Sequence, residues 1–132
     1  LQKLNKLDHN GKLPLDFAVR VFTQIIEGSA FLIDRLKIVH GLIEPRSIEF
    51  CSDRFIRTAQ GHHLPVTPRI ILTDLGNSFP IDSRDENRDA YSMQYKPPEI
   101  ALGLNVRKSS DIWACACVLY EMFFGKPLFN TA

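Results

Sequence analysis

The stretch IVHGLIEPRSIEF, residues 38–50, joins the clearest helical pattern of the chain to its first strand-like run. Before it, residues 15–36 carry apolar side chains at three- and four-residue spacing, which predicts an amphipathic helix. The apolar runs at 47–50 and 69–73 are rich in β-branched residues, which favours two short strands. We therefore expect residues 38–50 to lead from a long helix into a small sheet.

Several segments outside this framework are rich in polar and breaking residues. Residues 1–7 could form one or two helical turns before an Asn-Gly step and a proline. Residues 51–68 are predicted to form an exposed insert, and residues 77–95 an irregular, solvated loop. His62 and His63 lie in the insert without a third ligand nearby, so a solvated loop is favoured over a metal site.

The last third of the chain predicts two more helices. Residues 97–104, PPEIALGL, favour a short helix that begins after the prolines. Residues 111–124 are apolar nearly all round, which is typical of a helix inside a domain. Ser109 or Ser110 is expected to cap the start of this helix, and Gly125 to mark its end.

Composition limits the class of protein. The chain has 132 residues, of which 45% are hydrophobic and 23% charged, and its net charge is +1. This composition predicts a soluble globular domain or part of one, with no nucleic-acid or membrane partner. The longest apolar run, residues 112–120, is too short to span a bilayer. The chain starts at Leu1 without a signal peptide, so we expect a piece of a longer intracellular protein, nuclear or cytoplasmic.

The chain contains three cysteines, an odd number for a disulfide framework. Cys115 and Cys117 lie two apart in the second helix, and residues at that spacing do not share a helical face. Together with Cys51 they are predicted to be free thiols that serve as small core residues in a reducing compartment.

Four motifs occur in a familiar order: HGLIEPRSI at 40–48, TDLGN at 73–77, QYKPPEIALG at 94–103 and the helix-containing stretch 109–129. Together they resemble the C-terminal lobe of a eukaryotic protein kinase. The likeness is greatest to the CMGC branch, which holds the SR-protein, LAMMER and dual-specificity Tyr-regulated kinases. It implies a mainly α (α+β) fold, with helices around a buried central helix and a short β-hairpin-type pair. Residues 1–132 would then form part of a kinase-like domain that lacks the N-lobe and the last helices.

The resemblance aligns residues 40–47 with the kinase loop H-R-D-L-K-P-E-N. Leu42 replaces the aspartate that accepts the proton of the substrate hydroxyl, and a hydrocarbon cannot replace a base worth about 10²- to 10⁴-fold in rate. Glu44 replaces the lysine that faces the transferred phosphate, and would repel that phosphate. Ser47 replaces the asparagine that holds magnesium. No catalytic residue is therefore expected in this loop.

Asp74 of the DLG triplet has two interpretations. By resemblance it would bind magnesium across the nucleotide phosphates. Alternatively, it caps the turn after a strand, as aspartate often does. ATP and magnesium are implied by the resemblance only, and no cofactor is expected for the chain as it stands. The sequence has no G-x-G loop and no V-A-I-K-like lysine strand.

The other matched positions have structural roles by resemblance. His40 would pack beneath the loop, Asp111 would hydrogen-bond the loop backbone, and Trp113 would pack nearby. Glu99 would pair with an arginine of a later helix that this sequence does not contain. For the same reason we expect residues 111–124 to leave part of their apolar surface exposed.

The segment before the PPE motif contains hydroxyl groups that could accept phosphate. Tyr91, Ser92 and Tyr95 are candidates by type and place. Met93 and Lys96 stand where this branch of kinases has basic residues that bind phosphate, and lysine lacks the two-pronged geometry of arginine. We therefore expect ordinary hydroxyl and ring packing in this segment.

Three hypotheses remain open from the sequence. The first is a pseudokinase-like lobe that acts by binding a protein partner. The second is an active or weakly active Ser/Thr kinase whose N-lobe lies upstream, with Asp74 and an unusual base. The third is a gene fragment without function.

Overall fold

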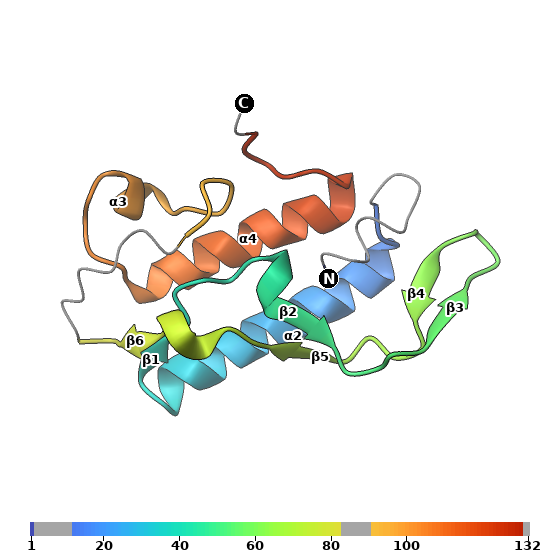
Figure 1. The fold of residues 1–132 in the computed structure, drawn as a ribbon, viewed down its shortest axis with the longest axis horizontal. Helices are drawn as coiled ribbons and strands as arrows, with labels where there is room; N and C mark the ends of the chain where they lie inside the picture. Colours follow the sequence, from blue (N-terminus) through green and yellow to red (C-terminus); the bar gives the residue numbers. More distant parts are fainter. Residues whose placement is uncertain (2–11, 83–90, 131–132) are drawn as a thin grey trace.

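The computed structural model describes residue 1, residues 12–82 and residues 91–130 (Figure 1). The helical turns expected at 1–7 and the charged part of the loop at 83–90 lie largely outside these residues. The described elements are α2 (Leu15–Asp34), β1 (Ile38–Val39), η1 (Pro45–Ser47), β2 (Ile48–Phe50), β3 (Phe55–Arg57), β4 (His63–Pro65), β5 (Ile70–Leu72), η2 (Leu75–Asn77), β6 (Phe79–Pro80), α3 (Pro98–Ala101) and α4 (Lys108–Phe124).

The core lies between α2 and α4, which run side by side in Figure 1. The amphipathic pattern of α2 buries one face, which includes Val21 and Ile25. The helix ends at Asp34, slightly earlier than expected, because the chain turns through a left-handed backbone at Lys37. Gly28 allows the strand to approach: a Cβ there would lie 2.9 Å from Leu72 Cδ1. The mainly α (α+β) class is confirmed.

The second long helix, α4, packs one side against α2 through residues that include Cys115 and Val118. As expected, its other side is not fully covered, and Ile112 and Phe124 are 51% and 50% exposed. The helix begins earlier than predicted, at Lys108, and ends before Gly125, which has the expected left-handed backbone.

The predicted capping serine was only partly right. Arg107 occupies the N-cap position, in place of Ser109 or Ser110. Ser110 lies one turn into the helix, and its Oγ accepts a hydrogen bond of 3.0 Å from the Arg107 backbone N–H. The helix start is thus stabilised by a residue inside it. The short helix α3 begins at Pro98, so the second proline lies inside its first turn.

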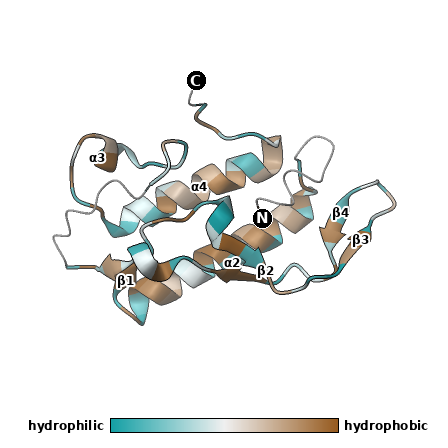
Figure 2. Cartoon of the chain, in the orientation of Figure 1, coloured by the Kyte–Doolittle hydropathy of each residue, from teal (hydrophilic) through white to brown (hydrophobic). Residues whose placement is uncertain are grey.

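The strands form three antiparallel pairs within the described residues: β1–β6, β2–β5 and β3–β4. The predicted pairing of the two apolar runs is confirmed, with Glu49 opposite Ile71. The insert predicted at 51–68 is largely exposed, but it is not only a loop: it forms the β3–β4 hairpin that projects at one end of the molecule (Figure 1). His63 lies in β4 opposite Arg57 and is not part of a loop. Figure 2 shows hydrophobic colour on both strands of the hairpin and a hydrophilic turn between them.

The cysteines are free, as predicted. Cys115 and Cys117 are buried, and burial raises the pKa of the Cys115 thiol to about 12, so this thiol is unreactive at neutral pH. Cys51 is exposed, which contradicts its prediction as a core residue.

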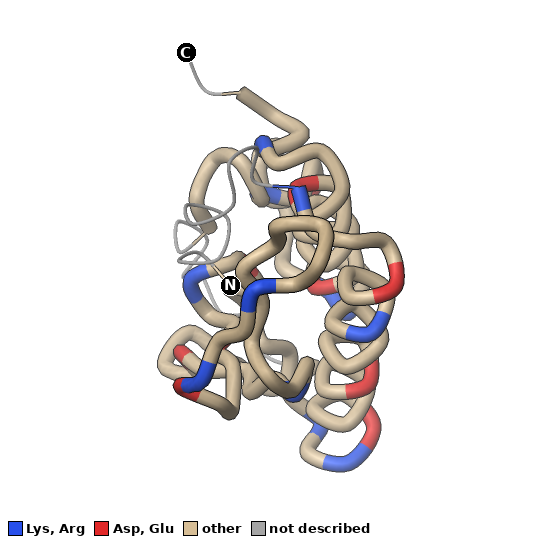
Figure 3. The backbone as a smooth tube through the Cα atoms, turned by 90° about the vertical axis from the view of Figure 1, so that its right-hand side faces the viewer, with Lys and Arg blue, Asp and Glu red and all other residues tan. Residues whose placement is uncertain are grey.

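Charges of both signs are spread over the described residues. Figure 3 shows basic and acidic positions interspersed along the chain in that view. Among the described residues, no helix is both long enough and apolar enough to cross a membrane.

Gln24 connects α2 to the segment that leads into β5. Its Nε2 donates a hydrogen bond of 2.7 Å to the Pro68 carbonyl, and its Oε1 accepts one of 3.1 Å from the Ile70 N–H. One side chain thereby satisfies two backbone groups beside the core and fixes where the strand lies on the helix.

Replacement of Gln24 by leucine keeps the volume but removes both hydrogen bonds. We expect Gln24→Leu to lower the free energy of unfolding by roughly 1–3 kcal/mol, because two partly buried backbone groups lose their partner. Urea denaturation followed by the fluorescence of Trp113, the single tryptophan, measures the change. Thr23→Ala is the matched control, since the exposed Thr23 hydroxyl bonds only within its own helix. Equal effects of the two substitutions would contradict this role of Gln24.

Candidate functional site

One buried carboxylate holds the loop at 40–47 on α4. Asp111 Oδ2 accepts a hydrogen bond of 2.8 Å from the His40 N–H, and Asp111 Oδ1 accepts one of 3.0 Å from the Gly41 N–H. Burial raises the pKa of the Asp111 carboxyl, while the N–H groups of Gly41 and His40 act in the opposite direction. The two hydrogen bonds compensate for removing this carboxylate from water.

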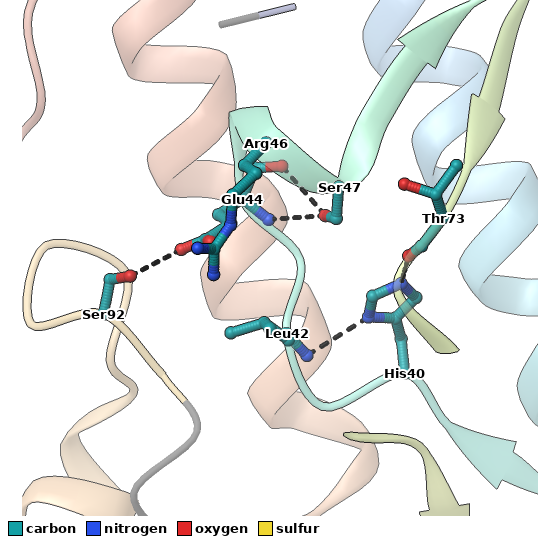
Figure 4. A network of polar contacts seen from close by, with 7 residues as sticks. All are labelled: His40, Leu42, Glu44, Arg46, Ser47, Thr73 and Ser92. Carbon is teal, nitrogen blue, oxygen red and sulfur yellow. Dashed lines mark hydrogen bonds and ion pairs between the residues drawn. The ribbon is translucent and has the colours of Figure 1, made fainter. Parts of the chain in front are cut away.

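His40 carries the connection from the loop to the end of β5. Its Nδ1 accepts a hydrogen bond of 3.1 Å from the Leu42 N–H, so its Nε2 carries the proton and donates to the Thr73 carbonyl at 2.7 Å (Figure 4). The ring is fully buried. Through these two hydrogen bonds the His40 ring fixes the loop relative to Thr73, the residue that precedes Asp74.

Gly41 is required by the backbone at this point. Its φ is +81°, and a Cβ there would lie 2.7 Å from the Asn77 carbonyl oxygen. A side chain would therefore both strain the backbone and collide with the turn at 75–77. The loop and the turn can approach closely because this position is glycine.

This close approach brings Leu42 and Asp74 to one cleft. The cleft has a volume of about 490 Å³ and is lined by Leu42, Arg46, Glu49, Asp74, Gly76 and Asn77. Leu42 is only 5% exposed, and the backbone N–H beside its side chain is already bonded to His40. At position 42 the cleft is therefore lined by a hydrocarbon side chain, which can neither accept a proton nor carry a charge.

Asp74 also lines this cleft and has a left-handed backbone conformation, with φ 61° and ψ 44°. Aspartate is one of the few residues that adopts this backbone readily. Asp74 is the N-cap residue of the η2 turn after β5, so the turn-capping interpretation was right in position, but its carboxylate makes no capping hydrogen bond. Within the described residues, no group of three or more His, Cys, Asp or Glu could hold a metal ion. The magnesium role of Asp74 stays a prediction.

Ser47 is turned away from the cleft. It is fully buried, its Oγ donates to the Glu44 carbonyl at 2.9 Å, and the Glu44 N–H donates to the same Oγ at 3.0 Å. The hydroxyl closes the η1 turn and does not line the cleft. Both hydrogen bonds of the Ser47 hydroxyl are thus made within the turn.

Glu44 is also buried, with 4% of its surface exposed. Its Oε1 lies 2.7 Å from the Arg46 guanidinium, and its Oε2 accepts a hydrogen bond of 2.7 Å from Ser92 Oγ (Figure 4). Arg46, which does line the cleft, was not singled out by the sequence analysis. One signal for Arg46 was present in the sequence. The kinase loop has lysine and then glutamate at these two positions, whereas this chain has Glu44 and then Arg46.

The remaining matched residues lie along α3 and α4. Glu99 Oε1 accepts a hydrogen bond of 2.5 Å from Ser110 Oγ, so α3 is tied to the start of α4. Trp113 stacks on Phe129, with ring centroids 5.8 Å apart and planes 6° from parallel. Through this contact, the segment that follows α4 covers part of the helix surface.

Two of the three candidate phosphoacceptors are buried. Tyr91 and Tyr95 lie in the core, and burial raises the pKa of both phenols. The Tyr95 hydroxyl donates to the Glu121 carboxylate, whereas the Tyr91 hydroxyl has no partner among the described residues. Ser92 is half-buried on Glu44. In this structure the two tyrosine rings are therefore part of the hydrophobic core, as the sequence predicted.

Comparison with known proteins agrees with this geometry. The family model described as "Protein kinase domain" matches residues 2–132. The chain is 28% identical over 131 residues to the serine/threonine-protein kinase AFC1 of Arabidopsis thaliana, covering 89% of this chain and 28% of that protein. It is 30% identical over 118 residues to the dual specificity protein kinase YAK1 of Saccharomyces cerevisiae, covering 86% of this chain and 12% of that protein. It is 32% identical over 128 residues to the probable serine/threonine-protein kinase dyrk2 of Dictyostelium discoideum, covering 94% and 12% respectively.

The chain belongs to the protein kinase domain family. Its relatives are kinases of the CMGC type, as the order of the motifs predicted. The chain spans 28% of the length of AFC1 and 12% of that of YAK1.

Asp111 should be far more important for stability than Asp74. We expect Asp111→Asn to lower the free energy of unfolding by roughly 2–4 kcal/mol, because an amide presents a donor to one of the two N–H groups. Asp74→Asn is the matched control and should change stability by less than about 0.5 kcal/mol, since its carboxylate is exposed and asparagine also adopts the left-handed backbone. Urea denaturation measures both, and a similar loss in the two variants would contradict the anchoring role of Asp111.

Comparing alanine substitutions at Gly41 and Gly103 distinguishes backbone strain from a steric clash of the added Cβ. Both have positive φ, at +81° and +75°, but a Cβ at Gly103 meets nothing within 4 Å. We expect Gly103→Ala to destabilise the chain by about 1–2 kcal/mol through strain alone. Gly41→Ala should destabilise it by at least about 1 kcal/mol more, since the Asn77 carbonyl must also move. Thermal unfolding of the two variants measures the difference, and equal midpoints would show that the loop does not press on the turn.

Proposed function

We propose that this chain is a pseudokinase-like C-lobe that acts by binding a protein partner without transferring phosphate. The observation that carries the proposal is that Leu42 lines the same cleft as Asp74. Phosphoryl transfer depends on positioning and on charge stabilisation around the substrate hydroxyl and the phosphate. Leu42 can provide neither a proton acceptor nor a charge.

The other altered positions support the same conclusion. The Glu44 carboxylate is occupied by Arg46 and Ser92, so it does not stand in for the missing base. The Ser47 hydroxyl is occupied by the backbone of Glu44. The network that holds the loop in place, Asp111 with His40 and Gly41, is complete. The loop keeps the hydrogen bonds that position it but lacks side chains suited to phosphoryl transfer. This combination favours a role as a binding scaffold.

The alternative is an active Ser/Thr kinase that depends on Asp74 when joined to an N-lobe. One observation favours it: the Asp74 carboxylate is exposed at the cleft and makes no capping bond. The residues present could place one oxygen ligand for magnesium there. The alternative still lacks a residue that would take the proton from the substrate hydroxyl.

Radiolabelled phosphate transfer separates the two functions. With γ-labelled ATP, magnesium and a mixed protein substrate, we expect the full-length protein to transfer no more label than its Asp74→Ala variant. Leu42→Asp alone should not restore transfer, because Glu44 remains paired and Ser47 remains turned inward. Turnover by the native protein that Asp74→Ala abolishes would establish the enzyme instead.

A further inference from the structure

The 91–97 segment is tied to the loop at 40–47 by a contact between residues 48 positions apart. Ser92 Oγ donates a hydrogen bond of 2.7 Å to Glu44 Oε2 (Figure 4). The second carboxylate oxygen of Glu44 is paired with Arg46 at 2.7 Å. Both oxygens of a carboxylate that is 4% exposed are therefore satisfied, as a buried charge requires.

Ser92 is the donor in this contact because position 44 carries an acid and position 46 a base, the reverse of the order in the kinase loop. A carboxylate at position 44 offers an acceptor to the serine hydroxyl. The cation at position 46 remains 60% exposed along its side chain, so it neutralises the carboxylate from the solvent side. The buried member of the pair is thus the anion, and the segment is held by its hydroxyl donor.

A second carboxylate holds the other end of the same turn. The Tyr95 hydroxyl donates to Glu121 on α4, and the Tyr95 N–H donates to the Ser92 carbonyl at 3.0 Å. The hydroxyl of Ser92 and the amide of Tyr95 therefore belong to one small structural unit. Two carboxylates, those of Glu44 and Glu121, hold this unit in place.

We propose that Glu44, Arg46 and Ser92 form a latch that keeps the 91–97 segment closed on the loop, and that a negative charge at position 92 opens it. A charged group at that position has no proton to donate and would lie beside the buried Glu44 carboxylate. Like charges this close repel, and burial of Glu44 limits screening by solvent. The latch is independent of whether the chain binds nucleotide or acts as a scaffold.

Amide hydrogen exchange of Tyr95 in the 132-residue chain tests the latch. Ser92→Ala should speed exchange of this amide by roughly tenfold, the effect of losing one hydrogen bond to a charged group. Ser92→Asp should speed it further. The double variant Glu44→Lys with Ser92→Asp reverses the polarity of the contact and should return exchange toward the native rate. The amide of Ile25, which is fully buried in α2, serves as the internal reference for global unfolding.

Glu49→Lys is the matched control, since it makes the same charge change at an exposed site five residues from Glu44. It should leave Tyr95 exchange unaltered. Native protection of Tyr95 in Ser92→Asp would overturn the latch. So would failure of the double variant to recover protection relative to Ser92→Asp, or an equal acceleration by Glu49→Lys.

Discussion

The structure depends on the contact between the Asp111 carboxylate and two successive backbone N–H groups, those of His40 and Gly41. These groups come from segments about seventy residues apart, and both ends of the contact are fully buried. A carboxylate in this position would be unfavourable without its donors, and the donors would be unsatisfied without the carboxylate. The contact therefore specifies how the loop lies on α4. The His40 ring is in turn hydrogen-bonded to the Thr73 carbonyl. Gly41, which has no side chain, allows the loop to pack closely against the turn at 75–77.

This network does not involve any residue that would have to take part in chemistry. Leu42, Glu44 and Ser47 differ from the kinase loop, yet the loop is complete as a piece of structure. Ser47 closes a turn, Glu44 pairs with Arg46 and Ser92, and the Leu42 amide is bonded to His40. The hydrogen bonds that hold this loop in place therefore do not depend on the side chain at position 42. This member of the protein kinase domain family thus keeps the loop anchored on α4 with a leucine at position 42.

The features that follow from local pattern were predictable from the sequence. The period of α2, the β-branched runs of β2 and β5, and Gly125 after α4 all act over a few residues. The β3–β4 hairpin was missed because its strands are three residues long and stand among polar and proline residues, so neither gave a period. The start of α4 was missed because Ser110 acts from within the helix.

Residues of the candidate site could be predicted from the sequence only where they belong to a recognisable kinase motif. The motifs brought His40, Asp74 and Asp111 to attention, and the structure places His40 and Asp111 in contact. The Ser92–Glu44 contact and the role of Arg46 depend on where two distant segments meet, which no local pattern records. The left-handed backbone of Asp74 and the exposure of Cys51 likewise depend on tertiary context.

The most direct test of a loop held by Asp111 is hydrogen exchange of the His40 and Gly41 amides in the 132-residue chain. Both amides should exchange only through global unfolding, at the rate of the slowest amides in α2 and α4, because their acceptor is buried. Exchange of these two amides as fast as that of exposed loop amides would contradict the account. It would mean that the loop at 40–47 is not fixed on α4.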